Sequence, residues 1–478
     1  MVRQYQIGDI IGERFKILDI LGGEGISGIG IVYVCADNEQ ENKNNKIALK
    51  TLQSQFLKLE KKIKTFKSEA LAWVLLEKSP YIINAEYVIN LEGRPFIAIE
   101  YIAPDDQGRN TLTDYLKYSI PLEIKLKWSI EVCIAMEHCA SRGLSPHRDI
   151  KPDNIMITKK GIAKVTDFGL SKFLIENKAI ITMLDMKNGE DLSSTLLRIT
   201  HGEVTGGSVP WMAPEQFEGI PDMKSDIYSL GCVMYQMVNK GKRPFNKFSI
   251  RHFYQAHSNE KPKPVFTELW PIIKKCLEKS PEDRYQTFAE LRKDLEKLYI
   301  KVFGKKPSFK LKRPQLTAKD YFNKGISFEA LGFIDEAIRE YIQTVKKDPK
   351  FFEAYYNLGV LYLLIDIFTF ALDEFHKALK LKPDSIETHK KIAFTYREML
   401  RLSDSIEKYK EILQMNPSEV LIYLDLAEIY ETLEDYDNAI ESYQKFIDSA
   451  PPKFSRDIKN AKKEKRRILK ILKKTQKE

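Results

Sequence analysis

The 478-residue chain lacks an apolar run long enough to span a bilayer, for which about 18 consecutive residues are needed. Its first residues, 1–6, lack the apolar core of a signal peptide. The five cysteines are scattered without a C-x-x-C pair, and the sequence has no metal-ligand cluster of His and Cys. We therefore expect a cytoplasmic protein whose cysteines are reduced thiols, mostly packed as small hydrophobic side chains.

The composition is that of a globular protein, because 43% of the residues are hydrophobic and 30% are charged. The length predicts roughly two to four domains. The net charge of +9 lies at one end: residues 453–478 hold twelve Lys or Arg against three acids, so the remaining chain is formally neutral. A charged end of this kind favours a solvated helix face over a nucleic-acid or membrane site.

A polar loop carries the strongest chemical signal. Residues 145–155 have the sequence SPHRDIKPDNI, which contains H-R-D-x-K-P-x-N. Phosphoryl transfer needs a carboxylate near the attacking hydroxyl, a positive charge on the phosphoryl group and a metal ligand. Asp149, Lys151 and Asn154 supply these three groups in that order. The pattern resembles the catalytic loop of protein kinases.

A glycine-rich turn lies near the N-terminus. A strand predicted over Phe15–Leu21 leads into residues 22–30, GGEGISGIG, and a second strand follows over Ile31–Val34. Glycine lets backbone N–H groups approach phosphate oxygens without a Cβ between them. Gly25, Gly28 and Gly30 are the candidate phosphate-binding residues. The loop is irregular in either register: counted back from Val32, G-x-G-x-x-G-x-V has Ser27 at its second glycine, and counted forward from Leu21, the loop is about three residues longer than usual.

A lysine and a glutamate form a predicted ion pair. The strand Ile47–Lys50 ends in lysine, and Glu69 follows it in an apolar helix predicted over Phe66–Leu76. A Lys50–Glu69 pair would hold the ammonium group against the phosphates of a nucleotide.

A second acidic residue follows the polar loop. Two short strands predicted over Ile155–Ile157 and Ala163–Val165 lead from this loop to Asp167-Phe168-Gly169. We expect these strands to bring Asp167 close to Asn154. Oxygen ligands from an Asp and an Asn suit Mg²⁺ that bridges phosphates.

Three more motifs complete a family resemblance. Residues 207–215 have the sequence GSVPWMAPE, Asp226 opens a predicted buried helix, and Arg284 follows a Ser-Pro-Glu-Asp turn. Residues from about Phe15 to Tyr299 resemble a Hanks-type (eukaryotic-like) serine/threonine protein kinase. The resemblance implies an α+β bilobal fold, a Glu215–Arg284 pair, and an Asp226 that braces the catalytic loop.

The resemblance also implies roles for the residues of the site. It implies that Asp149 and Lys151 are catalytic residues and that Asn154 and Asp167 bind the metal. The implied cofactors are ATP and Mg²⁺ (or Mn²⁺). Lys151-Pro152 implies Ser/Thr specificity, and Ser208 stands where such kinases place a threonine that contacts the catalytic Asp and Lys. ATP binding falls to Gly25, Gly28, Gly30, Val32, Ala48, Lys50, Glu69, Glu100, Ile102 and Met156.

The segment between Asp167 and Glu215 is longer than the activation segment usual in such kinases. Arg148 precedes the catalytic Asp, as in kinases that activation-loop phosphorylation switches on, and such a phosphate would dock on Arg148. A mobile insertion without a regulatory role is the alternative. The candidate acceptors are Thr182, Ser193, Ser194, Thr195, Thr200 and Thr205.

The C-terminal part of the chain repeats with a regular period. Small residues and aromatic residues recur in fixed registers, and a proline closes each unit. The period of about 34 residues is that of tetratricopeptide (TPR) repeats, in which small residues let paired helices approach and aromatic side chains fill the groove. The registers are Gly325, Gly359, Ala393 and Ala427; Phe328, Tyr362, Tyr396 and Tyr430; Ala337, Ala371, Ser405 and Ala439; Tyr341, Phe375, Tyr409 and Tyr443; and Pro349, Pro383, Pro417 and Pro451.

The sequence therefore predicts a kinase followed by an all-α TPR solenoid. The expected parts are a kinase domain over 1–300 (N lobe about 1–102, C lobe about 103–300), a basic linker over 301–316, four repeats over 317–452 and a basic capping helix or tail over 453–478. We expect protein substrates and a protein or peptide partner on the concave face of the repeats. The predicted concave face includes Phe322, Ile326, Tyr356, Val360, Lys390, Phe394, Arg397 and Tyr423.

The alternative function is a pseudokinase scaffold that acts through its repeats. Its expected mark is the loss of Lys50, Asp149 or Asp167, all of which are present. We find no strong reason in the sequence to expect nucleic-acid or membrane binding.

Overall fold

A computed structural model describes residues 4–22, 30–38, 46–167, 208–309 and 315–475. The chain divides into two compact units. The first runs to Gln315 and includes Ile326–Phe333, and the second contains Leu316–Gly325 and the chain from Ile334 onward. Among the described residues, no helix is both long enough and apolar enough to cross a membrane.

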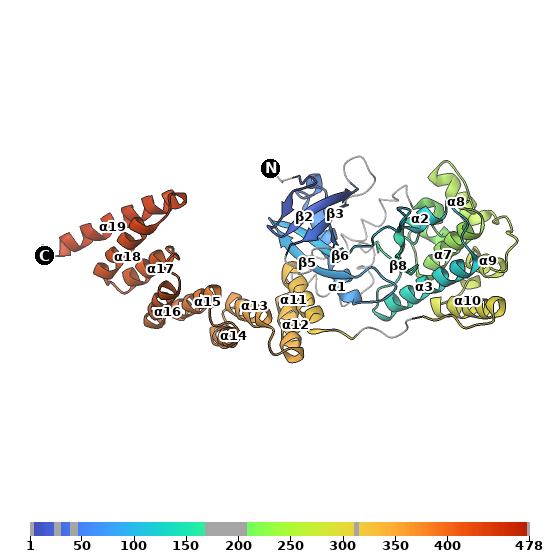
Figure 1. The fold of residues 1–478 in the computed structure, drawn as a ribbon. Helices are drawn as coiled ribbons and strands as arrows, with labels where there is room; N and C mark the ends of the chain where they lie inside the picture. The colour runs from blue at the N-terminus through green and yellow to red at the C-terminus, as the bar shows by residue number, and fades with distance from the viewer. Residues whose placement is uncertain (1–3, 23–29, 39–45, 168–207, 310–314, 476–478) are drawn as a thin grey trace. The chain divides into compact units, whose positions relative to one another are not determined.

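The N-terminal part of the first unit is a six-stranded antiparallel sheet with the order β1-β2-β3-β4-β6-β5 (Figure 1). Alternating side chains of these strands form one buried cluster around Phe15, Tyr33 and Phe96. The elements are β1 (Ile10–Ile11), β2 (Phe15–Leu21), β3 (Gly30–Asp37), β4 (Lys46–Leu52), η1 (Ser54–Phe56), α1 (Glu60–Leu76), β5 (Ala85–Leu91) and β6 (Arg94–Glu100).

Helix α1 is longer than the sequence predicted. Its apolar half, from Phe66 to Leu76, faces the interior, whereas the turns that precede it carry lysines and are exposed or only partly buried. The helix contacts β4 and β5, so Glu69 on α1 can face Lys50 on β4. The strands predicted over Phe15–Leu21, Ile31–Val34 and Ile47–Lys50 are confirmed as β2, β3 and β4.

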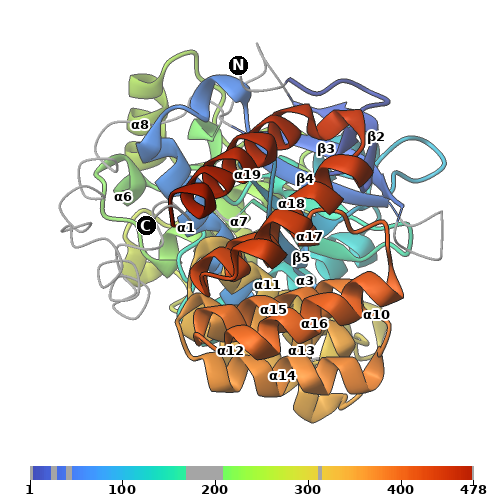
Figure 2. The same ribbon diagram turned by 90° about the vertical axis from the view of Figure 1, so that its left-hand side faces the viewer.

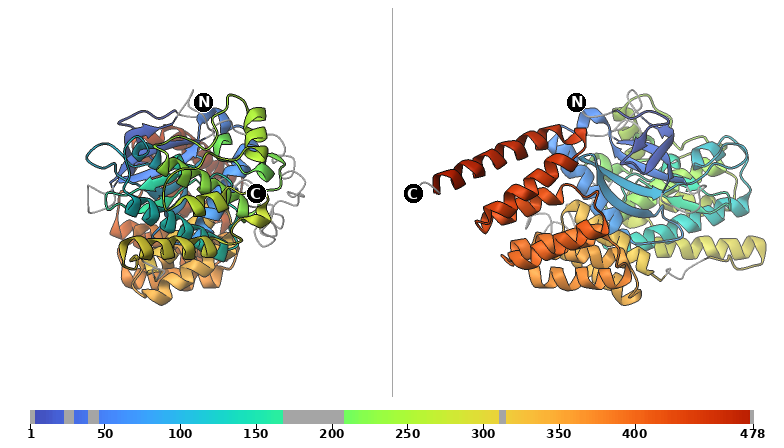
Figure 3. Two further views of the ribbon diagram at one scale, coloured as in Figure 1. Left: turned by 90° about the vertical axis from the view of Figure 1, so that its right-hand side faces the viewer. Right: turned by 60° about the vertical axis from the view of Figure 1, so that its left-hand side comes forward.

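The C-terminal part of the first unit is helical. Helix α3 is buried against α10, α7 and the two-stranded β7–β8 sheet (Figure 3, left). The polar loop over 145–155 follows shortly after this helix ends at Ser141. The elements are α2 (Leu112–Tyr115), α3 (Leu122–Ser141), η2 (Pro152–Asn154), β7 (Ile155–Ile157), β8 (Ala163–Val165), η4 (Val209–Trp211), α6 (Pro214–Phe217), α7 (Met223–Val238), α8 (Ile250–Asn259), α9 (Trp270–Cys276), η5 (Pro281–Asp283) and α10 (Phe288–Phe303).

The repeats form successive helices within residues 315–475, in which α13 packs on α14, α15 on α16 and α17 on α18, and Figure 2 shows the stacking of these pairs. A Cβ added to Gly325 would lie 2.5 Å from Tyr341, and one added to Gly359 would lie 2.5 Å from Phe375, which explains the small residue at this position. The helices are α11 (Ala318–Leu331), α12 (Ile334–Lys347), α13 (Phe352–Leu364), α14 (Phe368–Leu381), α15 (Ile386–Glu398), α16 (Leu402–Met415), α17 (Ile422–Thr432) and α18 (Tyr436–Ser449).

A short turn, η6 (Pro452–Phe454), leads to the basic helix α19 (Ser455–Thr475), which runs beside α18 (Figure 3, right). Ala461 and Ile468 of α19 are buried in the same cluster as Tyr443 and Phe446 of α18. Most of the basic side chains of this helix are exposed.

Candidate active site

Three side chains of the polar loop meet at one carboxylate. Lys151 Nζ donates to Asp149 Oδ2 at 2.9 Å, and Asn154 Nδ2 donates to the same oxygen at 3.0 Å and to the Asp149 carbonyl at 2.8 Å. The other oxygen, Asp149 Oδ1, is buried and has no hydrogen-bond partner among the described residues. An unpartnered buried acceptor costs free energy unless a ligand donates to it, so this oxygen is free to accept a proton from a bound hydroxyl.

Buried side chains hold the backbone of this loop. Asp226 of α7 accepts the N–H of His147 at 2.5 Å and the N–H of Arg148 at 2.7 Å, which confirms its predicted bracing contact. Burial raises the pKa of Asp226 to about 7, against these two bonds, which lower it. Arg148 has a left-handed backbone with φ of 67°, a conformation that costs about 1–2 kcal/mol for a residue with a side chain. The two bonds from Asp226 offset this cost.

His147 is buried between two backbone groups. Its Nδ1 accepts the N–H of Asp149 at 3.2 Å, so its Nε2 carries the proton and donates to the Thr166 carbonyl at 3.1 Å. Burial lowers the pKa of His147 to about 4. The neutral ring therefore links the loop that carries Asp149 to the residue that precedes Asp167.

The predicted Lys50–Glu69 contact is confirmed, and Lys50 also contacts Asp167. Lys50 Nζ lies 2.8 Å from Glu69 Oε1 and 2.6 Å from Asp167 Oδ1. Burial alone would lower the pKa of Lys50, but the carboxylates of Asp167 and Glu69 outweigh it and hold this pKa above its usual value. The Lys50 ammonium in turn lowers the pKa of Asp167. Both groups therefore stay charged at neutral pH.

A backbone hydrogen bond connects the two segments that carry the predicted metal ligands, Asn154 and Asp167. The N–H of Thr166 donates to the Asn154 carbonyl at 3.0 Å, which joins the end of the polar loop to the residue before Asp167. Asp167 has a half-exposed side chain and a left-handed backbone with φ of 52°. Carboxylate and amide oxygens are the ligands that Mg²⁺ prefers, so this pair of residues fits the predicted metal.

Three of the predicted ATP-binding residues, Val32, Ala48 and Glu100, lie on the adjoining strands β3, β4 and β6. Ala48 of β4 is buried and pairs with Val34 on one side and Ile99 on the other. Val32 pairs with Lys50, and Met156 lies at the centre of β7. Glu100 ends β6, and Ile102 lies two residues later and is 8% exposed.

The structure reaches only part of the glycine-rich turn. Gly30 begins β3, where it pairs with Leu52, and its carbonyl accepts Gln53 Nε2 at 3.3 Å. Gly25 and Gly28 lie outside the described residues, as do all six candidate phosphate acceptors between residues 182 and 205. The proposed docking of a phosphate on Arg148 therefore stays a prediction.

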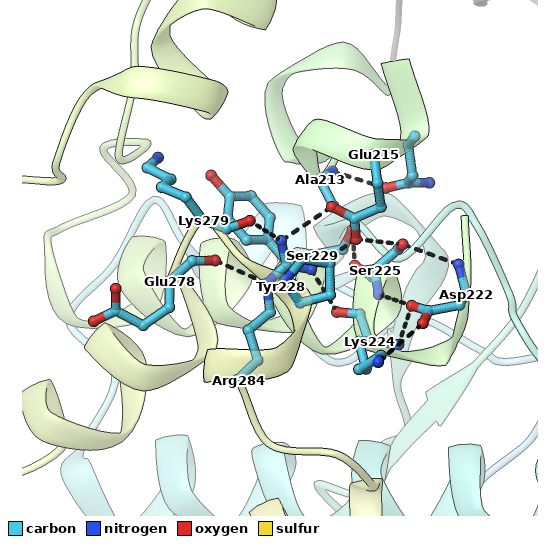
Figure 4. A network of polar contacts seen from close by, with 12 residues as sticks. Ala213, Glu215, Asp222, Lys224, Ser225, Tyr228, Ser229, Glu278, Lys279 and Arg284 are labelled. Carbon is cyan, nitrogen blue, oxygen red and sulfur yellow. Dashed lines mark hydrogen bonds and ion pairs between the residues drawn. The ribbon is translucent and has the colours of Figure 1, made fainter. Parts of the chain in front are cut away.

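A second buried ion pair anchors the segment after residue 208. Arg284 NH1 and NH2 donate to Glu215 Oε1 and Oε2 at 2.7 and 3.0 Å, and Ser225 Oγ donates to Oε1 at 2.6 Å (Figure 4). The predicted Glu215–Arg284 pair is thus confirmed. Ser208 is also where the sequence predicted, because Lys151 Nζ donates to its Oγ at 3.0 Å.

Sequence reasoning missed Gln216. Its Oε1 accepts the N–H of Ala213 at 2.8 Å, and its Nε2 donates to the Arg148 carbonyl at 3.1 Å. The side chain thus connects the A-P-E segment to the residue before Asp149. Its position directly after Glu215 is the only sequence signal, and that signal does not reveal the partner.

Comparisons with known proteins agree with this geometry. Residues 18–295 match the protein kinase domain family, residues 327–365 match a TPR repeat and residues 420–453 match a tetratricopeptide repeat. A probable serine/threonine-protein kinase of Clostridium perfringens is 33% identical over 331 residues, which cover 67% of this chain and 43% of that protein.

Two further relatives match over a somewhat shorter stretch. A probable serine/threonine-protein kinase of Clostridium acetobutylicum is 32% identical over 300 residues (60% of this chain, 40% of that protein). The serine/threonine-protein kinase PknB of Mycolicibacterium smegmatis is 29% identical over 299 residues (60% and 43%). The chain spans less than half the length of each of these relatives. It belongs to the protein kinase family and carries TPR repeats in its C-terminal region.

Proposed function

We propose that this chain is an ATP-dependent serine/threonine protein kinase that transfers the γ-phosphoryl group of ATP to Ser or Thr of protein substrates. The observation that carries the proposal is the state of Asp149. One carboxylate oxygen is held by Lys151 and Asn154, and the other is buried and without a partner among the described residues.

In this proposal Asp149 acts on the substrate hydroxyl. Its free Oδ1 orients the Ser or Thr hydroxyl toward the γ-phosphorus and accepts the hydroxyl proton as the O–P bond forms. Lys151 is already hydrogen-bonded to Asp149 and Ser208, and its ammonium group steadies the charge on the moving phosphoryl group. The bond between the γ-phosphorus and the β–γ bridging oxygen breaks, and ADP leaves with that oxygen. Catalysis of this kind is mostly positioning and charge stabilisation.

Lys50 would bind the α- and β-phosphates of ATP. Its contact with Glu69 directs the ammonium group into the site, and the pKa raised by Asp167 and Glu69 keeps it charged. Backbone N–H groups at Gly25, Gly28 and Gly30 would cover the phosphates. The Glu100 carbonyl and the Ile102 N–H would bond adenine, with Val32, Ala48 and Met156 on its two faces.

Asn154 and Asp167 would hold Mg²⁺, with Mn²⁺ as a substitute. A divalent ion supplies positive charge between the phosphates and so lowers the barrier to transfer. Asp167 can hold the ion with one carboxylate oxygen while its Oδ1 accepts from Lys50.

The repeats would bind a protein or a peptide. The two bases of the predicted concave face are already paired: Lys390 Nζ lies 2.8 Å from Glu419, and Arg397 lies 3.6 Å from Glu428 and 3.9 Å from Asp425. A partner at this face would therefore meet a neutralised surface with aromatic side chains instead of free positive charge. We propose that the repeats recruit substrates to the kinase or inhibit it, and that the protein acts in the cytoplasm.

The pseudokinase alternative gains no support. Lys50, Asp149 and Asp167 are present, and the three compared relatives are named serine/threonine-protein kinases.

The proposal is tested by incubating the full chain and a generic protein substrate with γ-labelled ATP and Mg²⁺. We expect labelled phosphoserine and phosphothreonine after acid hydrolysis, and no transfer when the metal is chelated. Label on tyrosine alone would contradict the Ser/Thr assignment, and a chain that binds ATP without transferring phosphate would support the scaffold.

A further inference from the structure

The end of strand β6 is held by its own side chain. Glu100 donates its backbone N–H to the Asn84 carbonyl at 3.0 Å. Its carboxylate accepts the Asn84 N–H at 3.2 Å and Asn84 Nδ2 at 3.3 Å, and it forms an ion pair with Lys164 Nζ. The kinase resemblance assigns a role only to the Glu100 backbone carbonyl, so it leaves this carboxylate unexplained.

Lys164 connects this strand end to the floor of the site. It lies on β8 directly opposite Met156 on β7, and directly opposite residues of an antiparallel pair point to the same face of a sheet. Only 11% of its side chain is exposed. The strand that carries it is itself fixed, because Val165 exchanges backbone hydrogen bonds of 2.9 Å with Tyr81 and Ile83.

Residues 100–102 form the connector that follows β6. The Glu100–Lys164 pair is one tether of this connector, and Asn110 supplies a second. Asn110 Nδ2 donates to the Ile102 carbonyl at 3.0 Å, and the Asn110 carbonyl accepts the N–H of Ile157 on β7 at 2.8 Å. An ion pair closes the turn before Asn110, in which the Asp105 carboxylate accepts two bonds from the Arg109 guanidinium, at 2.7 and 2.9 Å.

We propose that Glu100, Lys164 and Asn110 are positioning residues that fix the 100–102 connector relative to Met156, and that this holds the backbone groups of the connector in the positions that select adenine. The inference rests on the proposed function, because it concerns the ATP site of that function. The two backbone groups that would bond adenine, the Glu100 carbonyl and the Ile102 N–H, belong to the residues that the tethers hold. Met156 precedes Ile157 and lies opposite Lys164, the residues of β7 and β8 that the tethers contact.

The pattern of these backbone groups explains the selectivity. A carbonyl followed by an N–H matches the amino group and ring nitrogen of adenine, whereas guanine presents an acceptor and a donor in the opposite order. Such a site rejects the wrong base only if its groups cannot move to new partners. Loss of a tether would let the connector shift, so binding of ATP and discrimination against GTP would weaken together.

The experiment compares the full-length wild type with Lys164→Met, Glu100→Gln and Asn110→Ala. The steady-state rate is measured against ATP and against GTP at a saturating concentration of a generic protein substrate. For Lys164→Met we expect the KM for ATP to rise on the order of tenfold, because a hydrogen bond between charged groups is lost and Glu100 remains partly buried. We expect kcat to change by less than about threefold.

The ratio of kcat/KM for ATP to that for GTP separates positioning from a general loss of structure. It should fall in all three variants, and Lys164→Arg should restore most of it. Combining Glu100→Gln with Lys164→Met should cost less than the sum of the two single changes, because both remove one ion pair. Lys247→Met, which removes a 2.6 Å pair with Glu260, is the control and should leave the ratio unchanged.

The outcomes distinguish the two proposals. If the wild type transfers phosphate and the variants keep its KM for ATP and its ATP-to-GTP ratio, the positioning inference is wrong and the proposed function stands. If Lys164→Met is poorly folded, the nearly isosteric Glu100→Gln decides the question by the same ratio. If the wild type neither binds nor uses ATP, the proposed function fails, and the inference fails with it.

Discussion

The kinase unit and the repeats differ in the sequence separation of the contacts that stabilise each of them internally. In the kinase unit, the contacts that shape the site join residues far apart in the sequence: Lys50 and Asp167 are 117 residues apart, Asp226 and His147 are 79, and Arg284 and Glu215 are 69. In the repeats, Gly359 of α13 packs on Phe375 of α14, the helix that follows it directly, and the same contact recurs in the preceding repeat.

This difference determines how far a local defect should spread. The buried Glu215–Arg284 pair joins segments that are 69 residues apart, so its loss should destabilise the whole kinase unit. A repeat contacts mainly its neighbours, so its defects should stay local and add up along the solenoid. The predictions below test this contrast.

The largest effect is expected for Arg284→Met. Arg284 has a fully buried side chain, and its removal leaves the Glu215 carboxylate buried without a cation. Breaking such a pair costs about 3–5 kcal/mol. We expect a much lower unfolding temperature of the kinase unit by calorimetry. Arg292→Met, which removes a more exposed pair with Glu137, is the matched control, and an equal effect of both variants would contradict the contrast.

A smaller and local effect is expected for Gly359→Ala. The added Cβ would lie 2.5 Å from the Phe375 ring, so α13 and α14 must move apart. Overpacking of this kind costs about 1–3 kcal/mol. Amide hydrogen exchange of the folded chain, which reports local unfolding, should be faster in α13 and α14 alone. Faster exchange throughout the kinase unit would show that the repeats are not independent of it.

The combination of Gly359→Ala with Phe375→Leu provides the control for this explanation. The smaller leucine side chain relieves the close approach, so the double variant should be less destabilised than the sum of the two single changes.

The pH dependence tests the buried His147. Its folded pKa of about 4 lies below the ordinary value of 6.5, so between these values the unfolded chain binds a proton that the folded chain does not. Acidification therefore favours unfolding, by at most about 1.4 kcal/mol per pH unit. His147→Phe removes this titration. The stability advantage of the wild type over this variant should shrink as the pH falls from 7 to 4.5, and a constant difference would contradict the prediction.

The smallest effect is expected for an exposed pair of the repeats. Lys445 and Glu441 lie 2.7 Å apart on α18, and both side chains are more than half exposed. Exposed pairs of this spacing contribute about 0.3–0.5 kcal/mol. Lys445→Ala should therefore leave the unfolding temperature nearly unchanged. A large drop would contradict the expectation that this exposed pair contributes little to stability.

Much of the fold and part of the site could be predicted because motifs fix both residue type and spacing. The Lys50–Glu69 contact and the Glu215–Arg284 pair followed from such motifs, and the small and aromatic registers predicted the helix pairs of the repeats. In the third repeat, Ser405 replaces alanine in its register, and its Oγ is satisfied by donating to the Ala393 carbonyl at 2.8 Å.

The remainder depends on tertiary contacts that no local pattern marks. Strand β5 carries no motif, and it takes its place through pairing with β6. Gln216, Lys164 and Asn110 are polar residues of ordinary type, and only the folded chain shows that they hold the loop and the connector. Interactions of this kind become visible only once distant segments are placed side by side.

The most direct test of the central claim compares two identical substitutions in one loop. Asp149→Asn removes the proposed base, whereas Asp153→Asn changes a residue that accepts a hydrogen bond from Thr113 at 2.9 Å and has no proposed role in the chemistry. The rate of phosphate transfer from γ-labelled ATP to a generic protein is measured for both variants, together with their affinity for ATP. We predict that Asp149→Asn binds ATP but transfers essentially no phosphate, and that Asp153→Asn keeps the wild-type rate. Undiminished transfer by Asp149→Asn would contradict the account.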